Sequence, residues 1–259
     1  MTLLSISLTQ LQMGFLVFLR VTAILMTVPF LSSRNIPFVF KAGLALSLSV
    51  MLFPLLTLST APFVYDAIPF ALEVASEIAL GLIIGLSVRL IFAGIQLAGQ
   101  LEGFQMGFAL VNVMDPITSA QASIVAQFKH FIAMLIFLAI NAHHWFLRAI
   151  AESFNLVPPF GFRLNGSLME SLIRLAGTMF IIAIKVGAPV IVALLLTSVA
   201  FGLVARAVPQ MNVFIVAFPV KIIVGLGFIA ISLPYLLSFL RQLFENLGAD
   251  ILLILKAMA

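Results

Sequence analysis

Ionisable residues inside long apolar stretches are the first candidates for chemistry in this sequence. Glu73 and Glu77 lie four residues apart, so they share one helix face and could relay a proton or bind a cation. They also follow Pro69 closely, and carboxylates in the first turns of a helix are stabilised by its dipole. The sequence favours this structural role over proton relay or cation binding. Lys185 and Lys221 lie far from the ends of apolar stretches, and we expect them to face partner chains or an aqueous path.

Residues for metal binding or catalysis do not form a recognisable motif. His143 and His144 are adjacent, so their side chains leave a helix about 100 degrees apart and cannot bind one metal ion together, and His130 stands alone. No zinc-protease, phosphate-loop or serine-hydrolase motif occurs in the sequence. We therefore expect no metal site, no cofactor and no enzymatic activity. The remaining functions are transport and assembly with other molecules.

The composition indicates whether the chain lies in water or in a lipid bilayer. Of 259 residues, 63% are apolar and 8% are charged, whereas soluble domains carry about a quarter charged residues. The 13 basic residues exceed the 9 acidic ones but are spread along the chain, so no nucleic-acid-binding patch is expected. This chain is expected to lie in a lipid bilayer.

Continuous apolar runs predict an all-α integral membrane protein. Strands of a transmembrane barrel would alternate in polarity, and these runs do not. The first 19 residues lack the basic start and cleavage pattern of a signal peptide, so we expect them in the mature protein. The basic residues are too evenly divided to fix a topology. About six spans are predicted: Leu11–Leu31, Pro37–Leu58, Phe70–Ala98, Phe128–Ile150, Leu175–Val208 and Met211–Leu240.

The middle of the chain combines polar, aromatic and small residues. Gly81 and Gly85 are four residues apart, and Gly99, Gly103 and Gly107 repeat this spacing twice. Glycines four apart let another helix approach closely. The Asp115-Pro116 pair is expected to end the helical pattern. We interpret residues 99–121 as a re-entrant or cavity-lining segment, and an amphipathic loop on the membrane surface is the alternative.

Three groups of residues resemble the flagellar biosynthetic protein FliR family. The strongest is the run Gly202–Phe214, followed by Phe218-Pro219-Val220-Lys221 and Gly225. The others are Gly103, Gln105-Met106-Gly107 and Asp115-Pro116 in the middle segment, and Arg20, Pro29 and Pro37 near the start. The resemblance covers essentially the whole chain, and the injectisome equivalents share much of the pattern.

The resemblance implies a subunit of a type III export gate in the bacterial inner membrane, at the flagellar basal body. Such a subunit assembles with FliP-like and FliQ-like partners and other export components into a channel for unfolded flagellar proteins. Its helices would form stacked hairpins in a helical assembly. Residues 1–160 would be the FliP-like part, and residues 161–259 a FliQ-like hairpin, most alike over 170–247, with a C-terminal tail.

The resemblance also assigns roles to individual residues. A pore plug or gate would comprise Gly103, Phe104, Gln105, Met106, Gly107, Phe108, Asn112, Met114, Asp115 and Pro116. Buried charges and assembly contacts would involve Arg20, Lys185, Arg206, Pro209, Gln210, Asn212 and Lys221. The alternatives are the injectisome equivalent of the same gate and a small ion-coupled secondary transporter. The transporter would use Glu73, Glu77, Lys185 and Lys221, with a broken helix at Gly187–Pro189.

Overall fold

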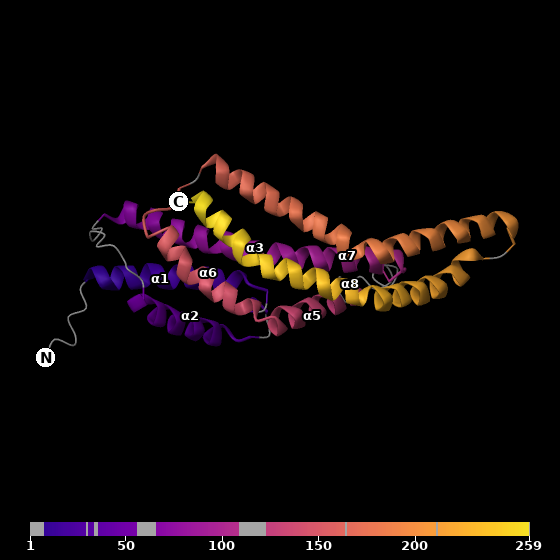
Figure 1. Cartoon of the computed structure of the whole chain (residues 1–259), viewed down its shortest axis with the longest axis horizontal. Helices are drawn as coiled ribbons and strands as arrows, with labels where there is room; N and C mark the ends of the chain where they lie inside the picture. Colours follow the sequence, from indigo (N-terminus) through magenta and orange to yellow (C-terminus); the bar gives the residue numbers. More distant parts are fainter. Residues whose placement is uncertain are drawn as a thin grey trace. The chain divides into compact units, whose positions relative to one another are not determined.

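The computed structural model describes residues 8–29, 31–33, 36–55, 66–108, 123–163, 165–210 and 212–258. All regular structure in these ranges is helical, which confirms the predicted all-α class (Figure 1). Figure 1 labels each helix except the short 3₁₀ helix η1. The helices are α1 (Leu8–Thr27), α2 (Phe38–Leu52), η1 (Phe53–Leu55), α3 (Ala67–Gln105), α5 (Ile124–Ala139), α6 (Ala142–Leu156), α7 (Gly166–Ala207) and α8 (Val213–Met258).

The predicted count of six spans is too high for the described helices. Four of them, α1, α3, α7 and α8, are long and apolar enough to cross a membrane, and α5 with α6 makes a fifth if counted as one broken span. In the described part of the expected second span, α2 has 15 residues and reaches about 22 Å, less than the roughly 30 Å hydrocarbon core, and η1 continues it to Leu55. The expected fourth span is interrupted at Ile140–Asn141, because Asn141 adopts a left-handed conformation with φ of 56°.

Three helices are much longer than a membrane span requires. Helices α3, α7 and α8 contain 39, 42 and 46 residues, whereas about 20 suffice for the hydrocarbon core. Helix α7 continues through Pro189, so the break expected at Gly187–Pro189 for a transporter is not present. The turn expected between Arg206 and Asn212 is confirmed, because α7 ends at Ala207 and α8 begins at Val213.

Close contacts divide the chain into two compact units. The first comprises residues 1–90, 141–175 and 245–259, and the second comprises residues 91–140 and 176–244. Helices α3, α7 and α8 contribute to both units. In the first unit the start of α7 lies near the end of α8. Arg163 N, just before α7, donates a hydrogen bond to Met258 O at 3.1 Å.

The first unit packs α1 against α3 at the predicted small-residue positions. A Cβ atom added to Gly81 would lie 2.6 Å from Ala23 Cβ and 2.8 Å from Arg20 O, and one added to Gly85 would collide with Thr27. Glycine is required there because the α1 backbone occupies the space of a side chain. This confirms the contact expected from the Gly81 and Gly85 spacing.

The second unit is built around the end of α3. Its core contains Met106, Val125, Val190, Leu194 and Ile229, all almost fully buried. The first of the three tandem glycines lies against α5, because a Cβ on Gly99 would come within 2.5 Å of Ala126 Cα. The first of the tandem glycines therefore lets another helix pack closely, as the spacing predicted.

Candidate functional site: buried ion pairs and the segment after α3

A buried ion pair joins α1 and α3 in the first unit. Arg20 Nε donates to Glu77 Oε2 at 2.5 Å and Arg20 Nη2 donates to Glu77 Oε1 at 2.7 Å, in a two-pronged arrangement. Arg20 Nη1 also donates to Ser153 O in α6 at 2.9 Å, and its guanidinium carbon lies 4.1 Å from the centre of the Phe154 ring. Arg20 and Glu77 are 0% and 2% exposed, so this contact fixes three helices relative to one another.

Glu73 has a different structural role from the one predicted. Its Oε1 accepts a hydrogen bond from Phe160 N at 2.5 Å, in the turn that follows α6. Helix α3 begins at Ala67 and has no acidic residue in its first turn, so neither Glu73 nor Glu77 stabilises the helix dipole as expected. The dipole interpretation is wrong because the helix begins earlier than Pro69 indicated. Both carboxylates instead hold other parts of the first unit.

A second buried ion pair lies in the second unit. Lys129 Nζ on α5 donates to Glu102 Oε1 on α3, and it also lies 3.3 Å from Val186 O on α7. The side chains of Lys129 and Glu102 are 2% and 0% exposed. The pair therefore joins three helices, as the Arg20 contact does in the first unit. The sequence held one signal for this pair: Glu102 precedes the polar middle segment, and Lys129 is the next cation along the chain.

Unpartnered polar atoms lie on both sides of the middle segment. Glu102 Oε2 and Gln105 Oε1, near the end of α3, and Ser123 Oγ, before α5, are buried and have no hydrogen-bond partner among the described residues. Gly103 lies directly beside Ser123, since a Cβ at Gly103 would collide with Ser123 Oγ. Burying such atoms without a hydrogen-bond partner costs free energy. Additional donors or acceptors close to them would therefore stabilise this part of the structure.

The first half of the predicted plug is a helix end. Gly107 N donates to Phe104 O at 3.1 Å and Phe108 N donates to Gly103 O at 3.0 Å, the two bonds of a Schellman cap. Gly107 has the left-handed φ of 93° that this cap requires, and Met106 is fully buried. Asn112, Met114, Asp115 and Pro116 lie outside the described residues. The plug and the re-entrant segment therefore stay predictions.

The residues predicted for assembly contacts differ in their exposure. Arg206, Pro209, Gln210 and Asn212 are exposed around the turn between α7 and α8. Lys185 is exposed in the middle of α7, with Nζ 5.8 Å from the centre of the Phe239 ring. Lys221 is half-buried and lines a cavity of about 290 Å³ together with seven neighbouring residues of α7 and α8: Ser198, Phe201, Gly202, Ala205, Val213, Ala217 and Phe218. Among these predicted charges, only Arg20 is deeply buried within the chain.

Within the described ranges, no group of three His, Asp or Glu side chains could hold a metal ion. The rings of His143 and His144 lie 4.3 Å apart, but no third ligand joins them in this part of the chain. The buried charged pairs of the two units, Arg20 with Glu77 and Lys129 with Glu102, join helices to one another.

Comparison with known proteins relates these features to a family. The profile described as "Bacterial export proteins, family 1" matches residues 11–247, which include both buried ion pairs and the turn between α7 and α8. The chain belongs to this family. A protein named "Flagellar biosynthetic protein FliR" from Bacillus subtilis (strain 168) is 36% identical over 236 residues, covering 89% of each chain.

Other FliR proteins match over a similar length. The one from Escherichia coli (strain K12) is 30% identical over 249 residues, covering 95% of this chain and 94% of its own. The one from Pectobacterium carotovorum subsp. carotovorum is 33% identical over 238 residues, covering 91% and 90%. The resemblance to the FliR family is confirmed. With its apolar helices, the chain is a membrane protein of the flagellar export apparatus.

Proposed function

We propose that this chain is a subunit of the flagellar type III export gate in the bacterial inner membrane. With FliP-like and FliQ-like subunits and other export components, it forms the channel through which unfolded flagellar proteins leave the cytoplasm. It acts by position and movement, without a cofactor or an enzymatic step. The flagellar assignment is favoured over an injectisome because the relatives reported above are all named as flagellar proteins.

The apolar surface of α7 and α8 is the observation that carries this proposal. Their 42 and 46 residues correspond to about 63 and 69 Å of helix, roughly twice the hydrocarbon core. Large apolar side chains are exposed along both, including Ile184 at 65%, Leu203 at 62% and Ile231 at 74%. In the most apolar part of α8, only 17% of residues are buried. The hydrocarbon core covers only about half of such a length, which supports cover of part of this surface by other protein chains.

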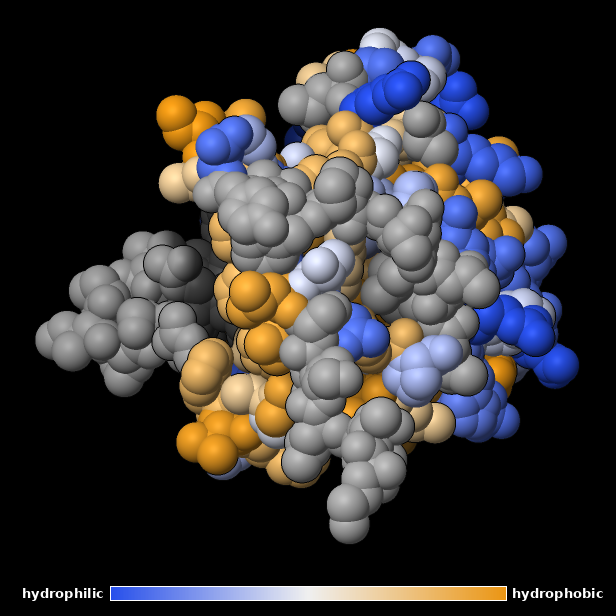
Figure 2. Space-filling view, turned by 90° about the vertical axis from the view of Figure 1, so that its left-hand side faces the viewer, coloured by the Kyte–Doolittle hydropathy of each residue, from blue (hydrophilic) through white to orange (hydrophobic). Residues whose placement is uncertain are grey.

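The surface of the first unit also exposes apolar side chains that lipid or protein must cover. Figure 2 shows one side of the molecule, on which apolar side chains in orange reach the surface beside polar ones in blue. The exposed apolar residues of α2 include Phe38 at 71% and Val39 at 81%. The apolar face of α2 therefore also needs cover from lipid or protein.

The cap after α3 supports a sealing role for residues 103–121. Met106 and the Gly107 cap anchor the start of this segment firmly in the second unit. The unpaired oxygens of Glu102, Gln105 and Ser123 lie beside its two ends. Methionine and phenylalanine give a deformable apolar seal, and the unpaired oxygens offer acceptors to partner chains. The segment would then seal the channel at rest and move during export.

The proposed division into a FliP-like part, residues 1–160, and a FliQ-like part, residues 161–259, accounts for the long hairpin. Helices α7 and α8 with one turn would be the unit that a two-helix partner supplies as a whole. The ion-coupled transporter finds less support. Glu77 already binds Arg20 through both oxygens, Glu73 binds Phe160 N, and the expected break in α7 is not present.

Dependence on partners tests this proposal. We expect the tagged chain to be recovered from membranes as a complex with FliP and FliQ, and to be unstable when expressed without them. Deleting its gene should abolish motility, and expression of the intact chain should restore it. A stable monomer that needs no partner, together with normal motility after deletion, would contradict the proposal.

A further inference from the structure

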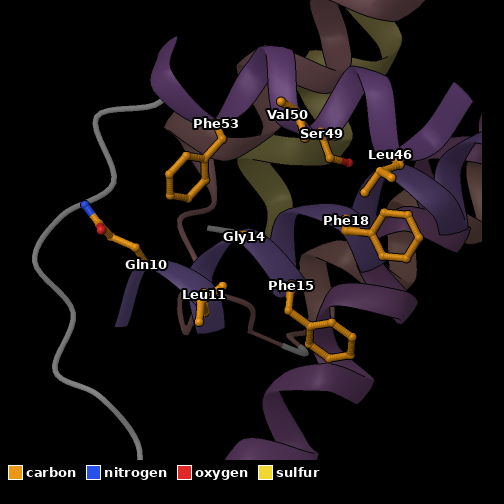
Figure 3. A pocket seen from close by; sticks show the side chains of 9 residues that line it. All are labelled: Gln10, Leu11, Gly14, Phe15, Phe18, Leu46, Ser49, Val50 and Phe53. Atoms are coloured by element: carbon orange, nitrogen blue, oxygen red, sulfur yellow. The ribbon is translucent and has the colours of Figure 1, made fainter. Parts of the chain in front are cut away.

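The pocket between α1 and α2 in the first unit is the strongest unexplained feature of the described structure. It has a volume of about 550 Å³, and its lining side chains come from the two helices and η1 (Figure 3). Gly14, Phe15 and Phe18 line one side, and Leu46, Ser49 and Phe53 line the other. None of the lining residues is charged.

The pocket exists because α1 and α2 do not approach closely enough to fill the space that small residues leave between them. At Gly81 the neighbouring helix fills the space that a side chain would take, but at Gly14 it does not. A Cβ on Gly14 would meet only the Phe53 ring, at 3.8 Å, which is an ordinary contact. Opposite Gly14, Ser49 is also small, and its hydroxyl donates to Ala45 O at 2.7 Å. Apart from the amide of Gln10, the lining thus presents apolar surface, and it has no hydroxyl in need of a partner.

These properties restrict what can occupy the pocket. Water is disfavoured because an apolar cavity offers it too few hydrogen bonds. An empty pocket would deprive its lining of dispersion contacts. A partner helix is about 10–12 Å across and would have to separate α1 and α2, which pack against each other here. A single flexible hydrocarbon chain satisfies each of these limits.

The surroundings of the pocket supply such a chain. Helix α1 is long and apolar enough to span a membrane. Leu11, Leu46 and Val50 line the pocket and are 57%, 55% and 67% exposed, so its opening lies on an apolar surface. In a bilayer the medium at this opening is hydrocarbon. We propose that the pocket between α1 and α2 binds one acyl chain of a membrane phospholipid. This site depends on the membrane location and not on the gate role.

Photocrosslinking in the assembled complex tests this site. A photoreactive amino acid at Leu46, at the opening of the pocket, and another at exposed Val39, on the same helix, are activated in native membranes. Mass spectrometry then distinguishes phospholipid adducts from protein adducts. We expect phospholipid adducts at Leu46. A protein adduct at Leu46, or no adduct, would overturn the proposal.

Pocket-filling variants make the test specific. Gly14→Leu projects a side chain into the pocket and should lower the lipid adduct at Leu46 roughly tenfold, since it excludes a few methylene groups. It should leave the adduct at Val39 unchanged. Gly43→Leu is the matched control on α2, because a Cβ at Gly43 meets nothing within 4 Å. If Gly14→Leu prevents assembly, Val50→Phe fills the opening from the exposed side. An undiminished lipid adduct in the assembled variant would overturn the site.

Discussion

Arg20 and Glu77, 57 residues apart in sequence, meet through two hydrogen bonds of 2.5 and 2.7 Å in the interior of the first unit. The same arginine donates to Ser153 O and contacts the Phe154 ring, so one side chain holds α1, α3 and α6. A buried pair adds little net stability over a well-packed apolar replacement, but removing one partner leaves an uncompensated charge.

Replacement of Glu77 by alanine should therefore destabilise the chain strongly. We expect a loss of about 3–5 kcal/mol, seen as a lower melting temperature of the purified complex and as reduced motility. Glu170→Ala is the matched control, because Glu170 binds Arg174 in an exposed pair whose side chains are 74% and 75% exposed. That control should cost at most about 1 kcal/mol. Equal effects of the two changes would contradict the proposed role of Glu77.

The second buried pair should be more sensitive to single than to double replacement. Lys129→Met leaves the carboxylate of Glu102 buried without its cation, at a cost of about 3–5 kcal/mol. Combining it with Glu102→Gln removes both charges and should restore much of the lost stability and assembly. The measurement is the yield of complex and its melting temperature. A double variant no more stable than Lys129→Met alone would contradict charge compensation.

Gly81→Ala should weaken the contact between α1 and α3. The added Cβ would fall 2.6 Å from Ala23 Cβ and 2.8 Å from Arg20 O, and overpacking of this kind costs about 1–3 kcal/mol. Gly177→Ala in α7 has open space around it and should be neutral or slightly stabilising, since alanine is the better helix former. Thermal unfolding of the two variants in the same detergent decides the matter. Equal melting temperatures would rule out close approach at Gly81.

Gly107→Ala should disturb the anchor of the proposed plug. Alanine costs about 1–2 kcal/mol at a left-handed φ, and its Cβ would lie 2.6 Å from Phe218 Cδ1. We expect a raised leak of small ions in cells that assemble the gate. Gly227→Ala on α8, where a Cβ meets nothing within 4 Å, is the control and should not leak. A tight membrane in assembled Gly107→Ala would argue against this anchor.

The sequence predicted those features that local pattern determines. Apolar runs located most helices, the Gly81 and Gly85 spacing located a helix contact, and the residues between Arg206 and Asn212 formed the expected turn. The distant partners were not predictable. Periodicity identifies the face of a helix that is buried, but it does not tell which helix lies opposite, so Arg20 was noticed without its counter-ion and the pair of Glu102 and Lys129 was not predicted.

Two features that were not predicted had signals in the sequence. Asn141 lies inside an apolar run, and asparagine is enriched in left-handed backbone, so the interruption of the fourth span was readable there. Gly107 was taken as the third member of a packing spacing. Its position after Phe104-Gln105-Met106 also fits a helix cap, and the structure uses it in both ways: Gly107 caps α3, and a Cβ there would lie 2.6 Å from Phe218 Cδ1 on α8.

Ion conductance of the assembled complex with a shortened middle segment tests the central claim most directly. Because Met106 is part of the core and Gly107 caps α3, the deletion is confined to residues 110–114 and leaves both in place. In planar bilayers, we predict that the complex with this deletion conducts small ions steadily, whereas the complex with the intact chain stays closed. A fully assembled deletion complex that conducts no more than the intact one would contradict a sealed export channel.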